Sequence, residues 1–540
     1  MKQEKRFVLI ILGLTLAFAA YLRFFNLGTP SFWVDELDFV VAAQSQARVG
    51  EPLLASGYVY PRAPILTYAL TASYSIFGVS EFSSRLPSAI FGWLSVLVVF
   101  FIGKRWFNAR IGLIAAIFMA IAPFEVGWSR VCRMYALFQL LFLLAMFFLY
   151  QGFEKSPEHG RHWLVAPWEL HWPSLLAGFL FLLLSYTTHQ NAALFVVTFS
   201  TYLASMAFLT AFNGNWSSWL RNKYTALTLV AVSGLVIALA VPAVRDFLAY
   251  AVGYQPKWAE VASAQNRWRI FEFFMNRSHF PINVLCLVGA FMVSWKRHQA
   301  GFYALLNLLV PVVFFSFVFQ YRKNDYIYHV YPVLFLLAAL PVERIMTFLQ
   351  ERLAAKTLKL ERFKEYAFLA AALFWIPFTP GFRLSQKIPR MADGQFNGAI
   401  YHNEWKAATQ YVGSRLVAQD LLISTLPLSV LHYMGRVDYN LNWSNAALAK
   451  ERNILAPDGR VVDFYSGADI IDTLNELKRV LSLHRQGWLL LDNYRFNNPV
   501  YVPATVNAFL REETRKAYET ANGTISVFRW HDRNSQAATN

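Results

Sequence analysis

The stretch SFWVDELDF, residues 31–39, contains three acidic residues, Asp35, Glu36 and Asp38. It begins within ten residues of the end of the first long apolar run of the chain. Carboxylates just outside a membrane face are costly to place unless they bind a cation, bind a substrate or accept a proton. The alternative is that these acids cap the next helix or are simply solvated. The stretch therefore predicts either a functional site or a helix cap at this membrane face.

The composition of the chain is that of a polytopic membrane protein. The 540 residues are 56% hydrophobic and only 15% charged, whereas about one quarter of a soluble protein is charged. The net charge of +16 comes from Lys and Arg in short loops between apolar runs, as the positive-inside rule requires. No nucleic-acid partner is expected, because no basic patch lies on a soluble fold. Two cysteines, Cys132 and Cys286, exclude a disulfide framework.

Eleven apolar runs approach the 20 or so residues needed to cross a membrane. They are 7–22, 86–103, 111–127, 135–151, 173–190, 191–211, 224–244, 281–295, 301–320, 328–347 and 366–381. Lys2, Lys5 and Arg6 place the N-terminus inside and Asp35 outside. An odd number of spans puts the tail outside as well. We expect the spans to lie in the cytoplasmic (inner) membrane of a cell envelope. We expect a transmembrane domain over residues 1–382, with an outer-face loop over 26–84.

Two regions outside the spans have regular patterns. Residues 36–48 and 62–77 predict short interfacial helices, the second with Tyr68, Tyr74 and Phe77 toward lipid. From residue 383 onward the charge increases, and helical and strand patterns alternate. The helical patterns are 404–418, 468–484 and 504–519, and the strand patterns are 420–425, 487–492 and 524–530. This alternation predicts an extracytoplasmic α/β domain with a partly parallel sheet over 383–540.

Several cations on the predicted outer face run against the positive-inside rule. Arg130 and Arg133 lie in the short segment 128–134, and Arg322 and Lys323 lie in 321–327. An anion on that side would explain them, because the arginine fork suits phosphate oxygens. The alternative is contact with lipid headgroups or snorkelling, which we favour for Arg85.

For two further candidate residues on this face, a purely structural role is the alternative to a functional one. His189, within TTHQN, is either a functional or a satisfied interfacial residue. Glu125, just after Pro123, is either a site residue or an ion-pair partner of Arg130.

The order of these motifs resembles a known family. After the DE pair come YPRAPILTYALTASYSIFGVSEFSSRLPSAIFGWLSVLVVFFIGKRWF (60–107), IAPFEVGWSRVCRMYAL (121–137), a span ending at His189, and YIYHVYP (326–332). Together they resemble the GT-C membrane glycosyltransferases, in the dolichyl-phosphate-mannose-protein mannosyltransferase-like branch that includes the bacterial lipid A aminoarabinose transferases. This chain has Asp325-Tyr326 where that family often has an Arg-Tyr pair.

The resemblance implies transfer of a hexose or pentose from a polyprenyl-phosphate donor, undecaprenyl or dolichyl, with inversion at the anomeric carbon. Inversion needs one base facing the acceptor hydroxyl, and the resemblance gives that role to Asp35, with Glu36 orienting substrate. The acceptor would be a protein, a glycolipid or a polysaccharide. Residues expected to hold the donor phosphate are Arg62, Arg130, Arg133 and Lys323, and other substrate contacts are expected from Glu125, Tyr135, His189 and Tyr326. The resemblance makes no cofactor certain, and a divalent metal on Glu36 and His189 is left open.

Three other functions compete with this one. The first is en bloc oligosaccharide transfer or ligation, although the tail has no WWD-type acceptor motif. The second is transport of a polyprenyl lipid, against which the acids cluster at one face and no two halves of the chain repeat. The third is a scaffold whose outer domain is the working part.

Overall fold

The computed structural model describes residues 2–154, 164–165, 170–213, 222–242, 245–246, 249, 266, 268–276, 279–296, 298–319, 322–354, 380–451, 453–456 and 458–531. These residues form two compact units. Unit 1 is made of residues 1–25, 88–129 and 134–389, and unit 2 is made of residues 26–87, 130–133 and 390–540.

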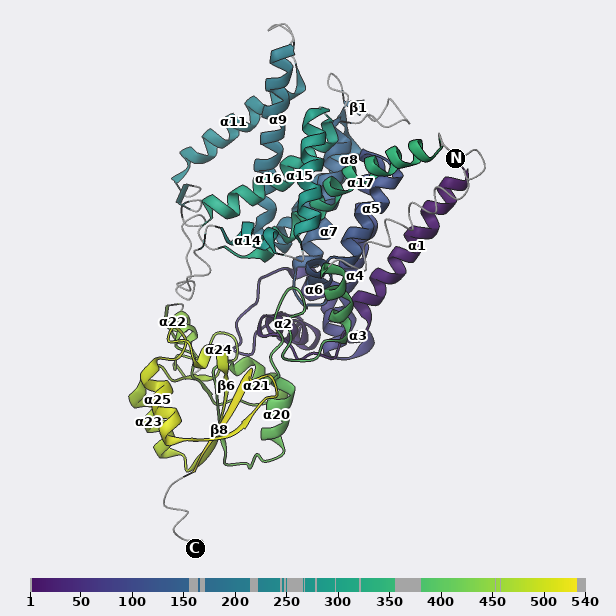
Figure 1. Cartoon of the computed structure of the whole chain (residues 1–540). Helices are drawn as coiled ribbons and strands as arrows, with labels where there is room; N and C mark the ends of the chain where they lie inside the picture. Colours follow the sequence, from purple (N-terminus) through teal and green to yellow (C-terminus); the bar gives the residue numbers. More distant parts are fainter. Residues whose placement is uncertain are drawn as a thin grey trace. The chain divides into compact units, whose positions relative to one another are not determined.

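Unit 1 is a bundle of mostly apolar helices (Figure 1). Its helices are α1 (Lys2–Phe24), most of α4 (Glu81–Trp106), α5 (Ala109–Ile121), α6 (Pro123–Ser129), α7 (Tyr135–Glu154), α8 (Trp172–Thr188), η2 (Gln190–Ala193), α9 (Leu194–Asn213), α11 (Lys223–Ala240), α14 (Arg269–Met275), α15 (Phe280–Trp295), α16 (Gln299–Val313), η4 (Phe314–Val318), η5 (Asn324–Val330), α17 (Tyr331–Ala354), α19 (Pro380–Lys387) and η7 (Ile388–Arg390). A short hairpin of β1 (Leu164–Val165) and β2 (Leu170–His171) precedes α8.

Helix α17 lies in the core of the bundle and packs against α5, α15 and α16. The α15 contact is very close, because a Cβ on Gly289 would lie 2.0 Å from the Leu337 carbonyl oxygen. Only a residue without a side chain lets two backbones approach to that distance, as is common between membrane helices.

Six helices of the described residues are long and apolar enough to cross a membrane, or up to eight if each of two bent pairs is one span. One bent pair is α5 with α6, which meet at 64° where Pro123 starts the second helix. The two runs predicted on either side of residue 190 are indeed separate helices, α8 and α9. The predicted span 366–381 lies almost wholly outside the described residues, so the number eleven stays a prediction. The chain is an integral membrane protein.

In unit 2, the first loop forms the two predicted short helices, α2 (Val34–Val49) and α3 (Pro64–Phe77). Helix α2 ends at Gly50, which adopts the left-handed conformation with φ +80°. Pro64 begins α3 at a position where no N–H is needed. The prediction that Tyr74 faces outward is wrong: it is buried, and its hydroxyl lies 2.8 Å from Ser84 Oγ. Tyr68 and Phe77 are exposed.

The remainder of unit 2 is a three-layer α/β fold. A six-stranded sheet has the order β5 (Asp469–Ile470), β4 (Tyr439–Asn440), β3 (Leu421–Ser424), β6 (Gln486–Asp492), β8 (Ile525–His531) and β7 (Arg515–Glu519). The first four strands are parallel, and β8 and β7 pair antiparallel. This confirms the predicted partly parallel sheet. The connecting helices are α20 (Trp405–Gly413), α21 (Pro427–Met434), α22 (Trp443–Glu451), α23 (Leu474–Leu483), α24 (Asn493–Phe496) and α25 (Ala504–Glu513).

The side chains of the central strand β6 pack against helices on both faces of the sheet, which accounts for the three layers. Trp488 and Leu490 pack with α20 and α21 on one face of the sheet, whereas Leu489 and Leu491 pack with α23 and α25 on the other (Figure 1). Such a strand is apolar on both faces. All three predicted helices are shorter than expected. Residues 469–470 and 515–519 are strands, and α20 ends at Gly413.

Candidate functional site

The acidic stretch forms the first turn of α2. Asp35 and Glu36 are both in that turn, where the exposed N–H groups of a helix favour negative charge. The Trp33 N–H donates to Glu36 Oε2 at 2.8 Å, so Glu36 caps its own helix. The helix-cap prediction is therefore confirmed for Glu36, and the functional site stays a prediction.

Glu36 is enclosed in a buried ion pair with Arg85. Arg85 Nε lies 2.8 Å from Glu36 Oε1, and neither side chain is more than 1% exposed. Glu36 Oε1 also accepts the Cys132 N–H at 2.7 Å. Burial by itself would raise the pKa of Glu36, but the Arg85 guanidinium holds it below its usual value. The expected direct role of Glu36 with substrate or metal is not supported by this geometry, since both of its oxygens are engaged. Arg85 is likewise an interior residue and not a headgroup contact.

Asp35 lies in different surroundings. Its side chain is 38% exposed, and its Oδ2 atom lies 3.9 Å from Arg133 Nη2. Arg133 is only 6% exposed and donates from Nη1 to the Asp35 carbonyl oxygen at 2.7 Å. The guanidinium also lies over the Phe39 ring, at 5.3 Å from its centroid. Arg133 therefore fixes the backbone of Asp35 and leaves the carboxylate partly exposed.

Asp38 adds a second carboxylate to this group. Its Oδ2 atom lies 3.9 Å from Arg133 Nη1. Burial, followed by the Asp35 charge, raises the pKa of Asp38 to about 8, although Arg133 and Arg62 oppose the shift. Asp38 is therefore largely neutral at pH 7. Its neighbour Asp35 faces solvent, and Arg133 carries a positive charge.

Two tyrosines that the sequence did not mark as site residues share this environment. Tyr60 is 4% exposed, and its hydroxyl has no hydrogen-bond partner among the described residues. Burial and then the Asp38 charge raise the pKa of Tyr60. Tyr465, from the C-terminal domain, has its pKa raised by burial and next by Asp38. Arg62, a predicted phosphate ligand, is exposed and acts electrostatically on both tyrosines.

Unit 1 gathers a second group of predicted residues. Tyr135 begins α7 and donates from its hydroxyl to Asp325 Oδ2 at 2.6 Å. The His189 ring lies 5.8 Å from that of Tyr135 and 6.3 Å from that of Tyr326. Asp325 is thus hydrogen-bonded to Tyr135, a predicted substrate residue.

The remaining predicted residues are spread out. Glu125, buried in unit 1, accepts from Gln139 Nε2 at 3.0 Å. Arg130 belongs to unit 2 and donates to the Asn26 carbonyl oxygen at 3.1 Å. Lys323 precedes the first residue of η5. Among the described residues there is no group of three or more His, Cys, Asp or Glu side chains that could hold a metal ion.

Comparisons with known proteins match this architecture. A family model described as dolichyl-phosphate-mannose-protein mannosyltransferase matches residues 61–168. YkcB of Bacillus subtilis (strain 168), named as a candidate mannosyltransferase, is 29% identical over 175 residues, which are 31% of this chain and 23% of that protein. An uncharacterized protein of Aquifex aeolicus (strain VF5) is 23% identical over 351 residues, 62% of this chain and 63% of its own. This chain therefore spans less than two thirds of the length of each of these relatives.

Solved structures match over nearly the whole chain. ArnT from Cupriavidus metallidurans, in the apo state, has a TM-score of 0.59 and 13% identity, and the match covers 98% of each chain. The archaeal oligosaccharyltransferase AglB from Archaeoglobus fulgidus also has a TM-score of 0.59 and 13% identity, with 97% of this chain and 74% of that one covered.

The chain is a membrane protein with the GT-C fold of glycosyltransferases. Over residues 61–168 it is similar to the dolichyl-phosphate-mannose-protein mannosyltransferases. The resemblance inferred from the sequence motifs is thereby confirmed.

Proposed function

We propose that this protein transfers one sugar, with inversion, from a polyprenyl-phosphate donor to an acceptor at the outer face of the inner membrane. The observation that carries the proposal is the pairing of a partly exposed carboxylate with a buried guanidinium, Asp35 with Arg133. The GT-C fold supports it, as does the similarity to ArnT, which has also been solved bound to undecaprenyl phosphate. The N-terminus would lie inside and the C-terminal domain outside.

In the proposed reaction, Asp35 accepts the proton of the acceptor hydroxyl as its oxygen attacks the anomeric carbon. The bond between that carbon and the phosphate oxygen breaks, and its electron pair leaves with the lipid phosphate. Phosphate is already a good leaving group, so no strong acid is needed. Arg133 and the exposed Arg62 would offset the charge that grows on the phosphate, since cations placed beforehand where charge develops stabilise a transition state.

En bloc transfer of an oligosaccharide is the second candidate, because AglB is as similar in fold as ArnT. The near-complete coverage of ArnT, against 74% of AglB, favours single-sugar transfer. Purified protein supplied with lipid monophosphate or lipid diphosphate donors separates the two candidates. Transfer from the diphosphate alone would reverse this preference.

The test of the proposal is Asp35→Asn in purified protein with polyprenyl-phosphate sugar donors and a cell-envelope acceptor fraction. Loss of the base should lower kcat by about 10²–10⁴-fold. Glu51→Gln, an exposed acid in the same loop, is the matched control and should retain wild-type turnover. Wild-type turnover by Asp35→Asn would refute the assignment of the base, and absence of transfer by the wild type from every donor would refute the function.

A further inference from the structure

The connection that leads into α2, residues 27–33, has its backbone held almost throughout. Arg85 donates from Nη1 to the carbonyl oxygens of Leu27 and Pro30, at 3.1 and 2.9 Å. It also donates from Nη2 to the Ser31 carbonyl oxygen at 3.0 Å. These contacts come from the beginning of α4. They leave the N–H groups of Ser31 and Phe32, and the carbonyl groups of Gly28 and Thr29, to other partners.

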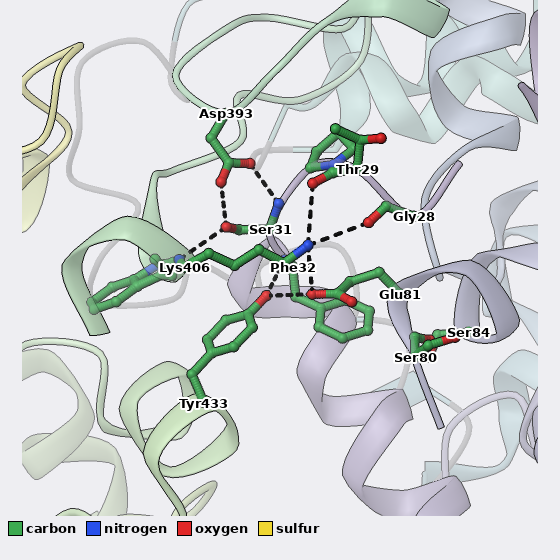
Figure 2. Close-up of polar contacts among 12 residues, drawn as sticks. Gly28, Thr29, Ser31, Phe32, Ser80, Glu81, Ser84, Asp393, Lys406 and Tyr433 are labelled. Carbon is green, nitrogen blue, oxygen red and sulfur yellow. Dashed lines mark hydrogen bonds and ion pairs between the residues drawn. The ribbon is translucent and has the colours of Figure 1, made fainter. Parts of the chain in front are cut away.

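Those other partners all belong to the C-terminal domain (Figure 2). Asp393 accepts hydrogen bonds from both the N–H and the hydroxyl of Ser31. The Ser31 hydroxyl oxygen in turn accepts the Lys406 N–H at 3.1 Å. His402, which is 2% exposed, places Nδ1 3.0 Å from the Ser31 carbonyl oxygen. Burial, with the nearby Arg85 charge, lowers the pKa of His402 to about 4, so the ring is neutral near pH 7.

Lys406 and Tyr433 extend this contact to both sides of Ser31. Lys406 Nζ donates to the carbonyl oxygens of Gly28 and Thr29, at 3.3 and 3.1 Å, and lies 2.9 Å from Glu81 Oε1. The Tyr433 hydroxyl accepts the Phe32 N–H at 2.8 Å and donates to Glu81 Oε1 at 3.1 Å. Figure 2 shows Lys406 and Tyr433 meeting at Glu81, the first residue of α4.

We define the tail clamp as Asp393, His402, Lys406 and Tyr433. Fixing the backbone of one residue costs about 1–2 kcal/mol of conformational entropy, so an unconstrained connection would sample many conformations. Asp35 follows Phe32 by three residues, and in the part of the chain that the structure describes its hydrogen bond and ion pair are with Arg133 and not with a clamp residue. Its carboxylate is partly exposed, and only the backbone beneath it is held.

We propose that the tail clamp positions Asp35 for reaction, and that the C-terminal domain is therefore a part of the catalytic apparatus. The proposal rests on the proposed function. The four clamp residues are positioning residues: they act on the connection, and the connection sets where the Asp35 carboxylate meets the acceptor hydroxyl. A displacement of about 1 Å in such a group can lower the rate about 10²-fold, so the effect should appear in kcat and not in binding of the donor.

The principal test compares two lysines of the C-terminal domain. Lys406 is 37% exposed and pairs with Glu81, and Lys516 is 42% exposed and pairs with Glu519 at 2.6 Å. We expect Lys406→Ala to lower kcat about 10–100-fold with the KM for the polyprenyl-phosphate donor and the unfolding temperature unchanged. Lys516→Ala should change none of these quantities. Lys406→Arg, which keeps the donors, should recover most of the turnover.

Hydrogen–deuterium exchange of the peptide covering residues 27–37 supplies a readout that does not depend on activity. Exchange there should increase in Lys406→Ala, and in a second variant, Asp393→Asn, but not in Lys516→Ala. Faster exchange with unchanged kcat would overturn the proposal while leaving the proposed function intact. Unchanged exchange would overturn it as well. If the wild-type protein transfers no sugar, the proposed function itself is refuted. This outcome differs from the two above, in which the wild type is active and only the positioning role fails.

Discussion

The Glu36–Arg85 region and the Asp35–Arg133 region begin at adjacent residues of α2, yet they differ in almost every physical respect. Glu36 is fully buried, and its oxygens are shared among Arg85 and two backbone N–H groups. Asp35 is 38% exposed, and its carboxylate lies at 3.9 Å from Arg133, beyond a direct hydrogen bond. Glu36 uses its hydrogen-bonding capacity within the fold, whereas the Asp35 carboxylate stays partly exposed, as the proposed base requires. Adjacent carboxylates can thus divide a structural and a chemical role.

The largest effect on stability is expected from Glu36→Gln. Removing one partner of a buried pair leaves the other charge uncompensated, which typically costs 3–5 kcal/mol. The free energy of unfolding, measured in detergent, should fall by about that amount. Glu512→Gln, an exposed acid on α25, is the control and should be neutral. A stable Glu36→Gln variant that has lost only turnover would give Glu36 the direct role that its geometry does not support.

The next effect is expected from Arg133→Ala. The variant loses the contact to the Asp35 carbonyl oxygen and the positive charge beside the carboxylate. Losing one such preorganised group lowers kcat by about 10²–10³-fold. Arg133→Lys should be intermediate, because an ammonium group keeps the charge without the fork. Arg415→Ala, at an exposed arginine two residues after the end of α20, should have no effect, and equal losses in both variants would contradict a specific role for Arg133.

A smaller effect on turnover is expected from Asp38→Asn. Asp38 has a pKa of about 8, so it is mostly neutral at pH 7 and asparagine resembles that form; kcat should remain within about threefold. The difference appears with pH. The folded pKa of Asp38 is above the unfolded value of about 3.9, so the contribution of Asp38 to the free energy of unfolding is greatest below about pH 4 and falls as the pH rises to about 8. The unfolding temperature of the wild type should therefore fall relative to Asp38→Asn between pH 5 and 8. Parallel curves would show that Asp38 is ionised throughout.

The smallest effect is expected from Tyr60→Phe. A buried hydroxyl without a partner costs about 1–3 kcal/mol, and the Tyr60 hydroxyl has none among the described residues. Its removal should leave the unfolding temperature unchanged or slightly raised. A matched tyrosine, Tyr433→Phe, should instead lower it, because that hydroxyl accepts the Phe32 N–H. If Tyr60→Phe raises the KM for donor or acceptor without affecting stability, the hydroxyl is held free for substrate.

Much of this arrangement could be predicted from local sequence. The acids at 35–38 predicted either a cap or a site, and the cations Arg130 and Arg133 of the predicted outer segment 128–134 stood out because they run against the positive-inside rule. The alternation of helical and strand patterns after residue 383 predicted the sheet. The partner of Glu36 could not be predicted, because a lone arginine near an apolar run is usually at a headgroup. Nor could Tyr465 or the tail clamp, since these depend on contacts between segments hundreds of residues apart. Tyr60 depends on how the loop after α2 folds back against Phe39 and Asp38.

The separation between Ser31 and Asp393 is 362 residues, whereas that between Ser31 and Arg85 is only 54. At about 5–20 residues per second of synthesis, Asp393 leaves the ribosome roughly 20–70 seconds after its partner, and Arg85 within about 3–11 seconds. The arginine can thus secure the connection while the remaining membrane helices are still being inserted. A nascent chain acquires its acidic helix early and the contacts of the tail clamp last, so a truncated product would carry the proposed proton acceptor without the residues proposed to position it.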